Sequence, residues 1–490
     1  MKKVLCFFIY ALPLFCIAQK QGNIWYFGSH AGLDFNSGIP VPLSNGQTYT
    51  PDGTPIEGTA VMSDNNGSLL FYTNGNKIWN RNQQLMPNGD SLFSTFSSTQ
   101  GALIIPQPGS SRYYYVFTVD DFYLDDLKYG FRYSVVDICL DGGLGDVISN
   151  RKNIKLLDTV AEKLTGVRHA NGTDYWIIVH KYYSDAFYSY HLASTGIVGS
   201  VISHIGSRHP VAYGPQNSGY ALGYMKASPN GQKLVVVSGN GYGLAEYFDF
   251  NRSTGVVSNF VNIQADSTYC YYGASFSPDN SKLYIACWLN DNGVYQFDLT
   301  AGGGNPNSVR GSKYKVAGQS PSHWAMQLGT DGKIYIATDT DYLSVINNPN
   351  NTGANCNYAD SVIHLIGGTG TQDDGLPNFI DSYDYSNILY SCTTAQDTCP
   401  EIFIPSLFSP NNDGNNDFEC IYGDKCLQSL HFVVYDRWGE KVFETNNSKD
   451  CWDGTFKGQR MNSAVFVYYL TAILISGEQI VKSGNISLVR

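Results

Sequence analysis

The chain has 490 residues, of which 43% are hydrophobic, 14% aromatic and 15% charged. This composition excludes a disordered chain, which would be poor in aromatic residues and rich in charge, and it is typical of many short strands joined by tight turns. The formal net charge of -11 comes without a basic cluster, which argues against nucleic acid or an anionic membrane as a partner.

The first 18 residues have the three parts of a secretory signal peptide. Lys2 and Lys3 precede an apolar run, residues 4–17, which ends at the small residue Ala18. The run is short for a membrane span and is interrupted by Pro13, so we expect cleavage near Ala18 and export. No later run of apolar residues is long enough to span a bilayer, and the sequence therefore predicts a mature chain without a transmembrane span.

A turn followed by a strand of β-branched and aromatic residues recurs six times between residues 22 and 388. The turn falls at positions 67, 109, 172, 231, 280 and 332, which gives spacings of 42, 63, 59, 49 and 52 residues. Asn230-Gly231 is one such turn, and the Asn-Gly pair favours a two-residue hairpin. Each copy is followed by a second strand and turn. A repeated unit of two hairpins is typical of a β-propeller blade.

The two ends of the repeat region carry complementary halves of this unit. Residues 24–38 resemble the second half alone, and residues 376–380 could supply the missing first half. Pairing of these ends would close the ring. The sequence therefore predicts an all-β chain with a seven-bladed propeller over residues 22–388, with six or eight blades as alternatives.

The turn at residues 277–280 and the strand at residues 283–286 resemble the repeats of the YVTN/WD40-like propellers of exported bacterial proteins. The resemblance covers about residues 22–388. It implies an architecture and almost nothing about activity, because such propellers include hydrolases, lyases, quinoproteins and binding platforms.

The repeat register indicates which residues line the mouth of the axial channel. A small residue stands six to nine positions before each turn, at Gly58, Gly101, Gly166, Gly223, Gly273 and Ala325. The residues beside them are the predicted ligand-binding ring, which consists of Glu57, Gln100, Thr165, Arg168, His169, Tyr272, His323 and Trp324, together with Ser322.

This ring suits the binding of a polar ligand better than catalysis. A general acid–base pair needs two titratable groups within reach of one substrate, and the ring offers mainly Glu57 with His323 or His169. The chain has no hydrolase elbow, P-loop, zinc-protease motif or dinucleotide fingerprint. We therefore expect a non-catalytic, secreted or cell-surface protein that binds an extracellular ligand, such as a glycan or a protein, or mediates adhesion. The alternative is a secreted hydrolase or lyase that acts on polysaccharide or on a small lactone-like substrate.

Residues 389–400 are small and polar and read as a linker, and strands alternate again over residues 401–490. Turn signals every ten residues or so predict six or seven short strands, which favours a small Ig-like β-sandwich.

Four motifs of this last segment, at residues 408–417, 435–443, 452–455 and 484–490, resemble in order those of the gliding-motility-associated C-terminal domain of Bacteroidetes. This is the type B sorting domain of the type IX secretion system. The resemblance implies a second export step across the outer membrane, with the secretion machinery as partner, and then release or retention at the surface. The motif residues are Asn411, Asp413, Gly414, Asp417, Arg437, Trp438, Gly439, Trp452, Asp453 and Gly454.

Ordinary packing explains several of these motif residues. We expect Trp438 and Trp452 to lie in the core, and Arg437 to donate hydrogen bonds to loop carbonyls. The oxygen side chains of Asn411, Asp413, Asn415 and Asp417 alternate as in half of a calcium loop. Tyr422 stands where such a loop would place its glutamate. A self-bonded Asx turn is therefore the favoured expectation, with no cofactor, and calcium is the alternative.

Five of the cysteines crowd the last hundred residues, which in an exported protein predicts local disulfides. The predicted pairs are Cys426–Cys451 and Cys399–Cys420, and the alternative is Cys420–Cys451. Cys392 would then be unpaired or would replace Cys399. Three other cysteines lie singly in apolar runs, as buried residues would, namely Cys139, Cys270 and Cys287. A zinc site is disfavoured because no pair of cysteines or histidines has ligand spacing.

Overall fold

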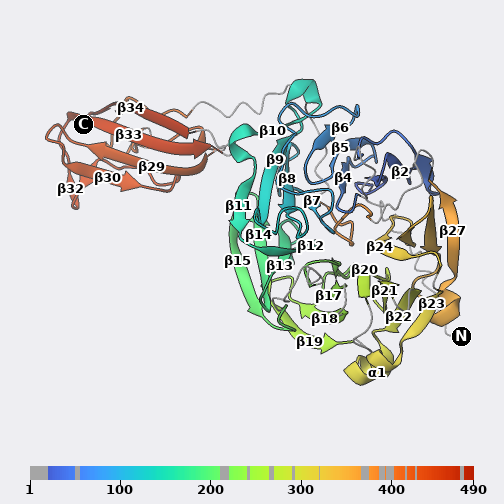
Figure 1. Ribbon diagram of the computed structural model, residues 1–490. Helices are drawn as coiled ribbons and strands as arrows, with labels where there is room; N and C mark the ends of the chain where they lie inside the picture. Colours follow the sequence, from blue (N-terminus) through green and yellow to red (C-terminus); the bar gives the residue numbers. More distant parts are fainter. Residues whose placement is uncertain are drawn as a thin grey trace, which may run out of the picture. The chain divides into compact units, whose positions relative to one another are not determined.

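Figure 1 shows the computed structural model of the chain. Its contacts divide the chain into two compact units, Met1–Tyr390 and Ser391–Arg490. No helix in the described part of the chain is long and apolar enough to cross a membrane. The expected signal peptide, residues 1–18, lies outside the described residues. The structure describes residues 20–49, 56–209, 220–239, 243–263, 270–289, 293–318, 320–365, 375–385, 392, 402–413, 416–424, 427–474 and 479–490.

Seven antiparallel sheets follow one another along the described part of the first unit and are arranged around a ring (Figure 1). This confirms the seven-bladed propeller over the six- and eight-bladed alternatives. The first two blades are β1 (Ile24–Phe27), β2 (Ala31–Asp34) and β3 (Val41–Leu43), then β4 (Ala60–Ser63), β5 (Leu69–Thr73) and β6 (Ile78–Asn80). The third is β7 (Ala102–Pro106), β8 (Tyr113–Val119), β9 (Phe131–Asp137), β10 (Asp146–Val147) and β11 (Ile154–Leu157).

The last four blades have four strands each. The fourth blade consists of β12 (Val160–Arg168), β13 (Tyr175–Lys181), β14 (Ala186–Ala193) and β15 (Gly196–His204). The fifth consists of β16 (Met225–Ala227), β17 (Lys233–Ser238), β18 (Leu244–Phe250) and β19 (Val257–Asn262). The sixth consists of β20 (Cys270–Phe276), β21 (Lys282–Leu289), β22 (Gly293–Asp298) and β23 (Tyr314–Ala317), and the seventh of β24 (His323–Leu328), β25 (Ile334–Thr338), β26 (Tyr342–Ile346) and β27 (Tyr358–His364). Helix α1 (Pro306–Gly311) and short 3-10 turns lie in the connections.

The repeated turns are the hairpins between the first and second strands of the blades. Gly231 has a φ of +67° between β16 and β17, and Asn280 has a φ of +66° between β20 and β21. Positive φ is the reason that Gly and Asn recur at this position. The second strand of each pair is buried on both faces, as in β17 and β25, because it lies between neighbouring strands and neighbouring blades.

The ring closes where the first blade meets the seventh. Trp25 and Phe35 pack edge-to-face against Tyr335, with ring centroids 5.5 and 5.3 Å apart. The returning residues 376–380 also reach this junction, since Phe379 lies 5.9 Å from Trp25 between ring centroids. Their one strand-like bridge, however, joins Pro377 to Thr59 rather than to β1. No strand pairing between this segment and β1 occurs among the described residues, so the predicted pairing of the two ends is not found there.

Residues 376–385, which we name the axial segment, lie in the centre of the ring, where Figure 1 shows them in orange. Asn378 donates through Nδ2 to the carbonyls of Ala102 and Leu164, at 3.2 and 2.9 Å. On the other side of the ring, the hydroxyl of Tyr383 donates to the carbonyl of Leu328. The segment is almost wholly buried. The axial segment thus packs against strands on more than one side of the ring.

The second unit is built on one mixed sheet in the order β28-β34-β33-β29-β30, in which β28 runs parallel to β34. Its core includes Trp452, which is 1% exposed and packs on Phe408 and Phe466, as predicted. The strands are β28 (Leu407–Phe408), β29 (Leu427–Tyr435), β30 (Lys441–Thr445), β31 (Thr455–Phe456), β32 (Gln459–Arg460), β33 (Ala464–Leu474) and β34 (Gln479–Leu488).

The prediction for Trp438 is wrong. This residue lies in the turn between β29 and β30 and is 80% exposed. Arg437 lies over its ring, with Cζ 5.0 Å from the centroid; its expected hydrogen bonds to loop carbonyls are not seen among the described residues. The motif spacing could not reveal this, because an aromatic residue in a tight turn can face either the core or solvent.

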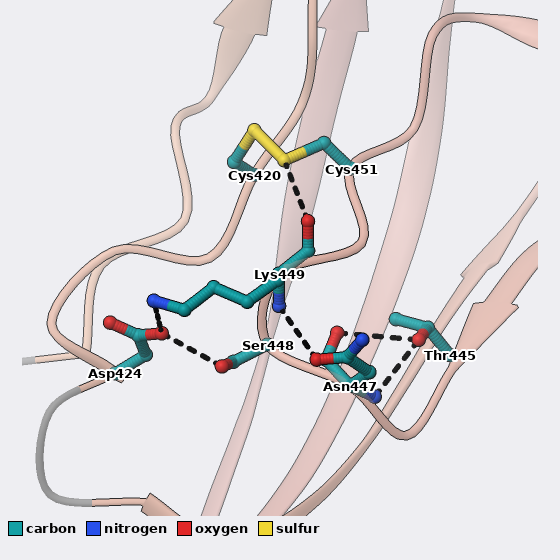
Figure 2. Close-up of a disulfide and its surroundings, with 7 residues drawn as sticks. All are labelled: Cys420, Asp424, Thr445, Asn447, Ser448, Lys449 and Cys451. Atoms are coloured by element: carbon teal, nitrogen blue, oxygen red, sulfur yellow. Dashed lines mark hydrogen bonds and ion pairs between the residues drawn. A yellow bond between two sulfur atoms is a disulfide. The ribbon is translucent and has the colours of Figure 1, made fainter.

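The disulfide predictions are also wrong, because Cys451 is bonded to Cys420 (Figure 2). This excludes Cys426–Cys451 and Cys399–Cys420 and leaves the alternative pairing. The neighbouring residues Glu419 and Trp452 exchange two backbone hydrogen bonds of 2.8 and 2.9 Å. That bridge places the two cysteine Cα atoms 4.6 Å apart, although 31 residues separate them in sequence.

The disulfide closes a loop that is pinned by polar contacts. Asp424 accepts hydrogen bonds from Ser448 and Lys449, at 2.7 and 2.6 Å (Figure 2). Cys399 and Cys426 lie outside the described residues. Cys139 and Cys392 are disulfide-bonded too, so Cys139 is not the single buried cysteine that its apolar surroundings predict.

Candidate functional site

Three residues of the predicted ring come together near the starts of the innermost strands. The hydroxyl of Tyr272, in β20, donates a hydrogen bond to Glu57, which precedes β4. Trp324, in β24, meets Tyr272 edge-to-face with ring centroids 5.4 Å apart. The carboxylate of Glu57 is thus partnered by a phenol from across the ring.

The small residues that defined this ring are explained by close backbone approach. A Cβ on Gly58 would collide with the backbone of Gly101, and one on Gly273 would collide with the carbonyl of Trp324. These are innermost strands that converge on the axis, where only glycine leaves enough room.

Gln100 and Thr165 are buried in the wall of the ring. Gln100 accepts from the amide of Met225 at 2.7 Å and donates to its carbonyl at 3.1 Å, which ties the third blade to the fifth. Thr165 is 0% exposed. Both side chains are therefore buried, and Oγ1 of Thr165 has no hydrogen-bond partner among the described residues.

The two predicted histidines each have partners of their own. His323 is 0% exposed and its Nε2 is 2.8 Å from the hydroxyl of Tyr358, and burial lowers its pKa to about 4. His169 stacks on His191 at 4.9 Å and accepts a hydrogen bond from a loop amide. Each histidine thus has its own partners, and its pairing with Glu57 as an acid–base pair stays a hypothesis.

Arg168 lies at the far end of β12, where a pocket of about 220 Å³ opens between the fourth blade, the fifth blade and the axial segment. Its wall includes the turn between β16 and β17, with Ser228 and Asn230, and the side chain of Arg252. The axial segment contributes Asp381, Ser382 and Asp384. The pocket is therefore lined mainly by hydrogen-bonding groups.

Arg168 is held in this wall by its two terminal nitrogens. Nη1 donates to the hydroxyl of Tyr175 at 3.1 Å and to the carbonyl of Asp384 at 2.8 Å, and Nη2 donates to the carbonyl of Gly172. Its Nε is buried and has no hydrogen-bond partner among the described residues. An unmatched buried donor is costly, and most are satisfied by protein, water or ligand.

Asp381 has an acceptor atom without a partner. Its Oδ1 accepts from Gln327 at 2.9 Å and lies 3.4 Å from Nζ of Lys226, while Oδ2 has no partner in the described part of the chain. Burial raises the pKa of Asp381 and lowers that of Lys226. Two residues of the pocket lining, from β12 and the axial segment, thus each carry one buried polar atom without a partner among the described residues.

A larger, open groove of about 650 Å³ adjoins the pocket. Arg252 belongs to both walls, and its Nε donates to the carbonyl of Arg168 at 2.9 Å. The groove is lined by polar groups of the fifth blade, among them the ion pair of Lys233 and Asp249. The two hollows thus share Arg252 as a wall residue.

Sequence reasoning found Arg168 but missed Asp381 and Arg252. The repeat pattern includes only residues before each turn, whereas Asp381 follows the last copy and Arg252 lies in the turn of a second half-motif. The composition of residues 381–384, with two aspartates after an apolar run, is the one local signal that could have drawn attention to the segment.

Two clusters of acidic and amide side chains are relevant to metal binding. Carboxylate oxygens of Asp120, Asp121 and Asp125 lie within 4.8 Å of one another, but those of Asp120 and Asp121 already accept hydrogen bonds from the loop. In the loop predicted as an Asx turn or calcium site, Asn411 accepts from the amide of Asp413 at 2.9 Å. Asp417 accepts from a neighbouring amide too. Gly414 and Asn415 lie outside the described residues, and calcium there stays a hypothesis.

Comparison with known families identifies the second unit. Residues 402–488 match the CHU_C type IX secretion signal domain. They are a type IX secretion signal domain. Such a domain implies export across the outer membrane to the cell surface or the medium, and an interaction with the secretion machinery. No curated protein matches the chain.

Solved structures similar to the chain are distant. Hydrazine synthase of Kuenenia stuttgartiensis is 12% identical, with 69% of this chain and 79% of that chain covered and a TM-score of 0.33. Hsv2 of Kluyveromyces lactis is 11% identical, with 67% and 90% covered and a TM-score of 0.37. The description of the propeller above rests on the sheets of this chain itself.

Deleting residues 401–490 is expected to leave the protein in the periplasm, because the type IX secretion signal domain is lost while residues 1–18, the expected signal peptide, are kept. Fractionation of the secreting bacterium, with the full-length chain as control, measures this. Truncated protein in the medium at the normal yield would contradict the assignment of the export signal to this domain.

Proposed function

We propose that this protein is a non-catalytic binding protein of the cell surface or medium, whose propeller holds a polyhydroxylated ligand, such as the end of a glycan, in the pocket beside Arg168. The observation that supports it most is the pair of unmatched polar atoms, Nε of Arg168 and Oδ2 of Asp381, on residues that line one pocket. A sugar hydroxyl can accept from the first and donate to the second, with small side-chain movements that bring these buried atoms into contact.

The size and polarity of the site support a sugar. A pocket of about 220 Å³ is below the usual range of sites for drug-sized molecules, which is about 300–1,000 Å³, and suits one monosaccharide unit. The polar groove that continues past Arg252 has room for further units. We therefore expect oligosaccharides to bind more tightly than the single sugar.

Binding is favoured over the hydrolase or lyase alternative by the arrangement of the titratable groups. The pocket wall has two carboxylates, but that of Asp381 is engaged with Gln327 and Lys226, and that of Asp384 lies 3.5 Å from Nη1 of Arg168. A general acid–base mechanism needs two titratable groups that are free to exchange protons with one substrate.

Blocking the pocket with Ser382→Phe is expected to weaken glycan binding at least tenfold, because the added ring would occupy the space between Arg168 and Asp381. The measurement is binding of the full-length protein to an array of neutral and acidic glycans. Ser200→Phe, on the exposed outer strand β15, is the matched control and should bind like the wild type. Absence of glycan binding, or equal binding by Ser382→Phe, would contradict the proposal.

A further inference from the structure

The turn between β29 and β30 presents a large aromatic side chain to solvent. Trp438 is 80% exposed, although tryptophan is among the costliest side chains to leave in water. The core of this domain is formed without it, by Trp452 and its neighbours. Stability of the domain therefore gives no reason for a tryptophan at this position.

Hydrogen bonds fix the backbone of this turn, so the indole is held in an outward-facing position. The carboxylate of Asp436 accepts from the amides of Trp438 and Glu440, at 2.9 and 2.8 Å. The amide of Gly439 donates to the carbonyl of Asp436, and Gly439 has a φ of +81°. Such a turn presents its side chains with little ordering cost on binding.

The guanidinium of Arg437 lies against the exposed ring. Cζ of Arg437 lies 5.0 Å from the centroid of Trp438. Tryptophan and arginine are the residues most enriched among those that dominate protein–protein binding energies. The geometry thus has the form of an anchor for a partner that offers an apolar pocket with carboxylates at its rim.

The charges around the turn favour a protein over a lipid surface. Arg437 and Lys457 are offset by Asp436 and Glu440, and Lys457 pairs with Glu440 at 2.9 Å. Binding to anionic lipid headgroups requires an excess of basic residues, which this turn lacks.

We infer that Arg437 and Trp438 form the contact by which this secretion signal domain docks on a protein component of the type IX machinery. The match of residues 402–488 to that domain supplies the partner, and the exposed, preorganised indole supplies the contact. This inference does not depend on what the propeller binds.

The test is export of the full-length protein carrying Trp438→Ala from a bacterium with a type IX system. We expect the fraction outside the outer membrane to fall at least tenfold, with retention in the periplasm and partial recovery in Trp438→Phe. Phe403→Ala removes another exposed aromatic of the same domain and should be exported normally. Normal export of Trp438→Ala, or equal retention of Phe403→Ala, would overturn the inference.

Two further readouts separate docking from folding and from lipid binding. The Tm of the purified Trp438→Ala protein should equal that of the wild type, because the ring is largely exposed; a fall in Tm that accounts for the retention overturns the docking role. Binding of the wild-type protein to phosphatidylglycerol vesicles, lost in Trp438→Ala, would also overturn it, by making the membrane the partner.

Discussion

Replacing Asp381 with alanine is expected to lower the free energy of unfolding of the propeller by about 3–5 kcal/mol. Asp381 and Lys226 are 4% and 1% exposed, and Nζ of Lys226 lies 3.4 Å from Oδ1 of Asp381. Removing the carboxylate leaves a buried ammonium with Gln327 as its remaining side-chain hydrogen-bond partner. It also removes the contacts of this carboxylate that tie the axial segment to Lys226 of the fifth blade and Gln327 of the seventh.

Guanidinium unfolding of the full-length chain measures this effect. Asp384→Ala is the matched control, because Asp384 is half exposed and its carboxylate lies 3.5 Å from Arg168; exposed pairs contribute about 0–1 kcal/mol. The double variant Lys226→Met/Asp381→Leu should regain much of the loss, since a buried ion pair can be replaced by apolar groups. Equal stability of Asp381→Ala and the wild type would show that the axial segment is not anchored by this pair.

The secretion signal domain is expected to lose stability as the pH rises from 5 to 8, and Glu419→Gln should remove most of that loss. Glu419 is 0% exposed, and neither carboxylate oxygen has a hydrogen-bond partner among the described residues. Burial raises its pKa to about 8. The folded state therefore favours the protonated acid, whereas the unfolded chain ionises near pH 4.3.

The sign follows from the linkage between proton binding and folding. Stability is complete below about pH 4.3 and declines as the pH rises through the folded pKa, by about 4–5 kcal/mol for a shift of this size. Calorimetric scans of the full-length chain at several pH values measure the transition of this domain. Glu440→Gln, at a position that is exposed, should keep the wild-type slope. A wild-type domain with no pH dependence in this range would contradict the prediction.

Repetition made most of the fold predictable from sequence. A blade cannot bury its faces alone, so Gly or Asn turns and apolar strands recur in every copy, and the turns at Gly231 and Asn280 are where the pattern places them. The motifs of the last ninety residues likewise led to the secretion signal domain, which the family comparison confirms. These features depend on residues that are close together in sequence, so the residue types alone are enough to predict them.

Contacts between residues far apart in sequence were decided only by the tertiary structure. The backbone bridge of Glu419 and Trp452 selects the Cys420–Cys451 pair, and the course of the axial segment brings Asp381 to Lys226 and to the pocket of Arg168. No spacing predicts such meetings. Five cysteines close together in sequence allow several pairings, and a chain that returns after more than a hundred residues can enter the ring in several registers. The sequence also could not decide whether Trp438 faces the core or solvent, because a turn motif fixes backbone dihedrals but not the direction of the side chain.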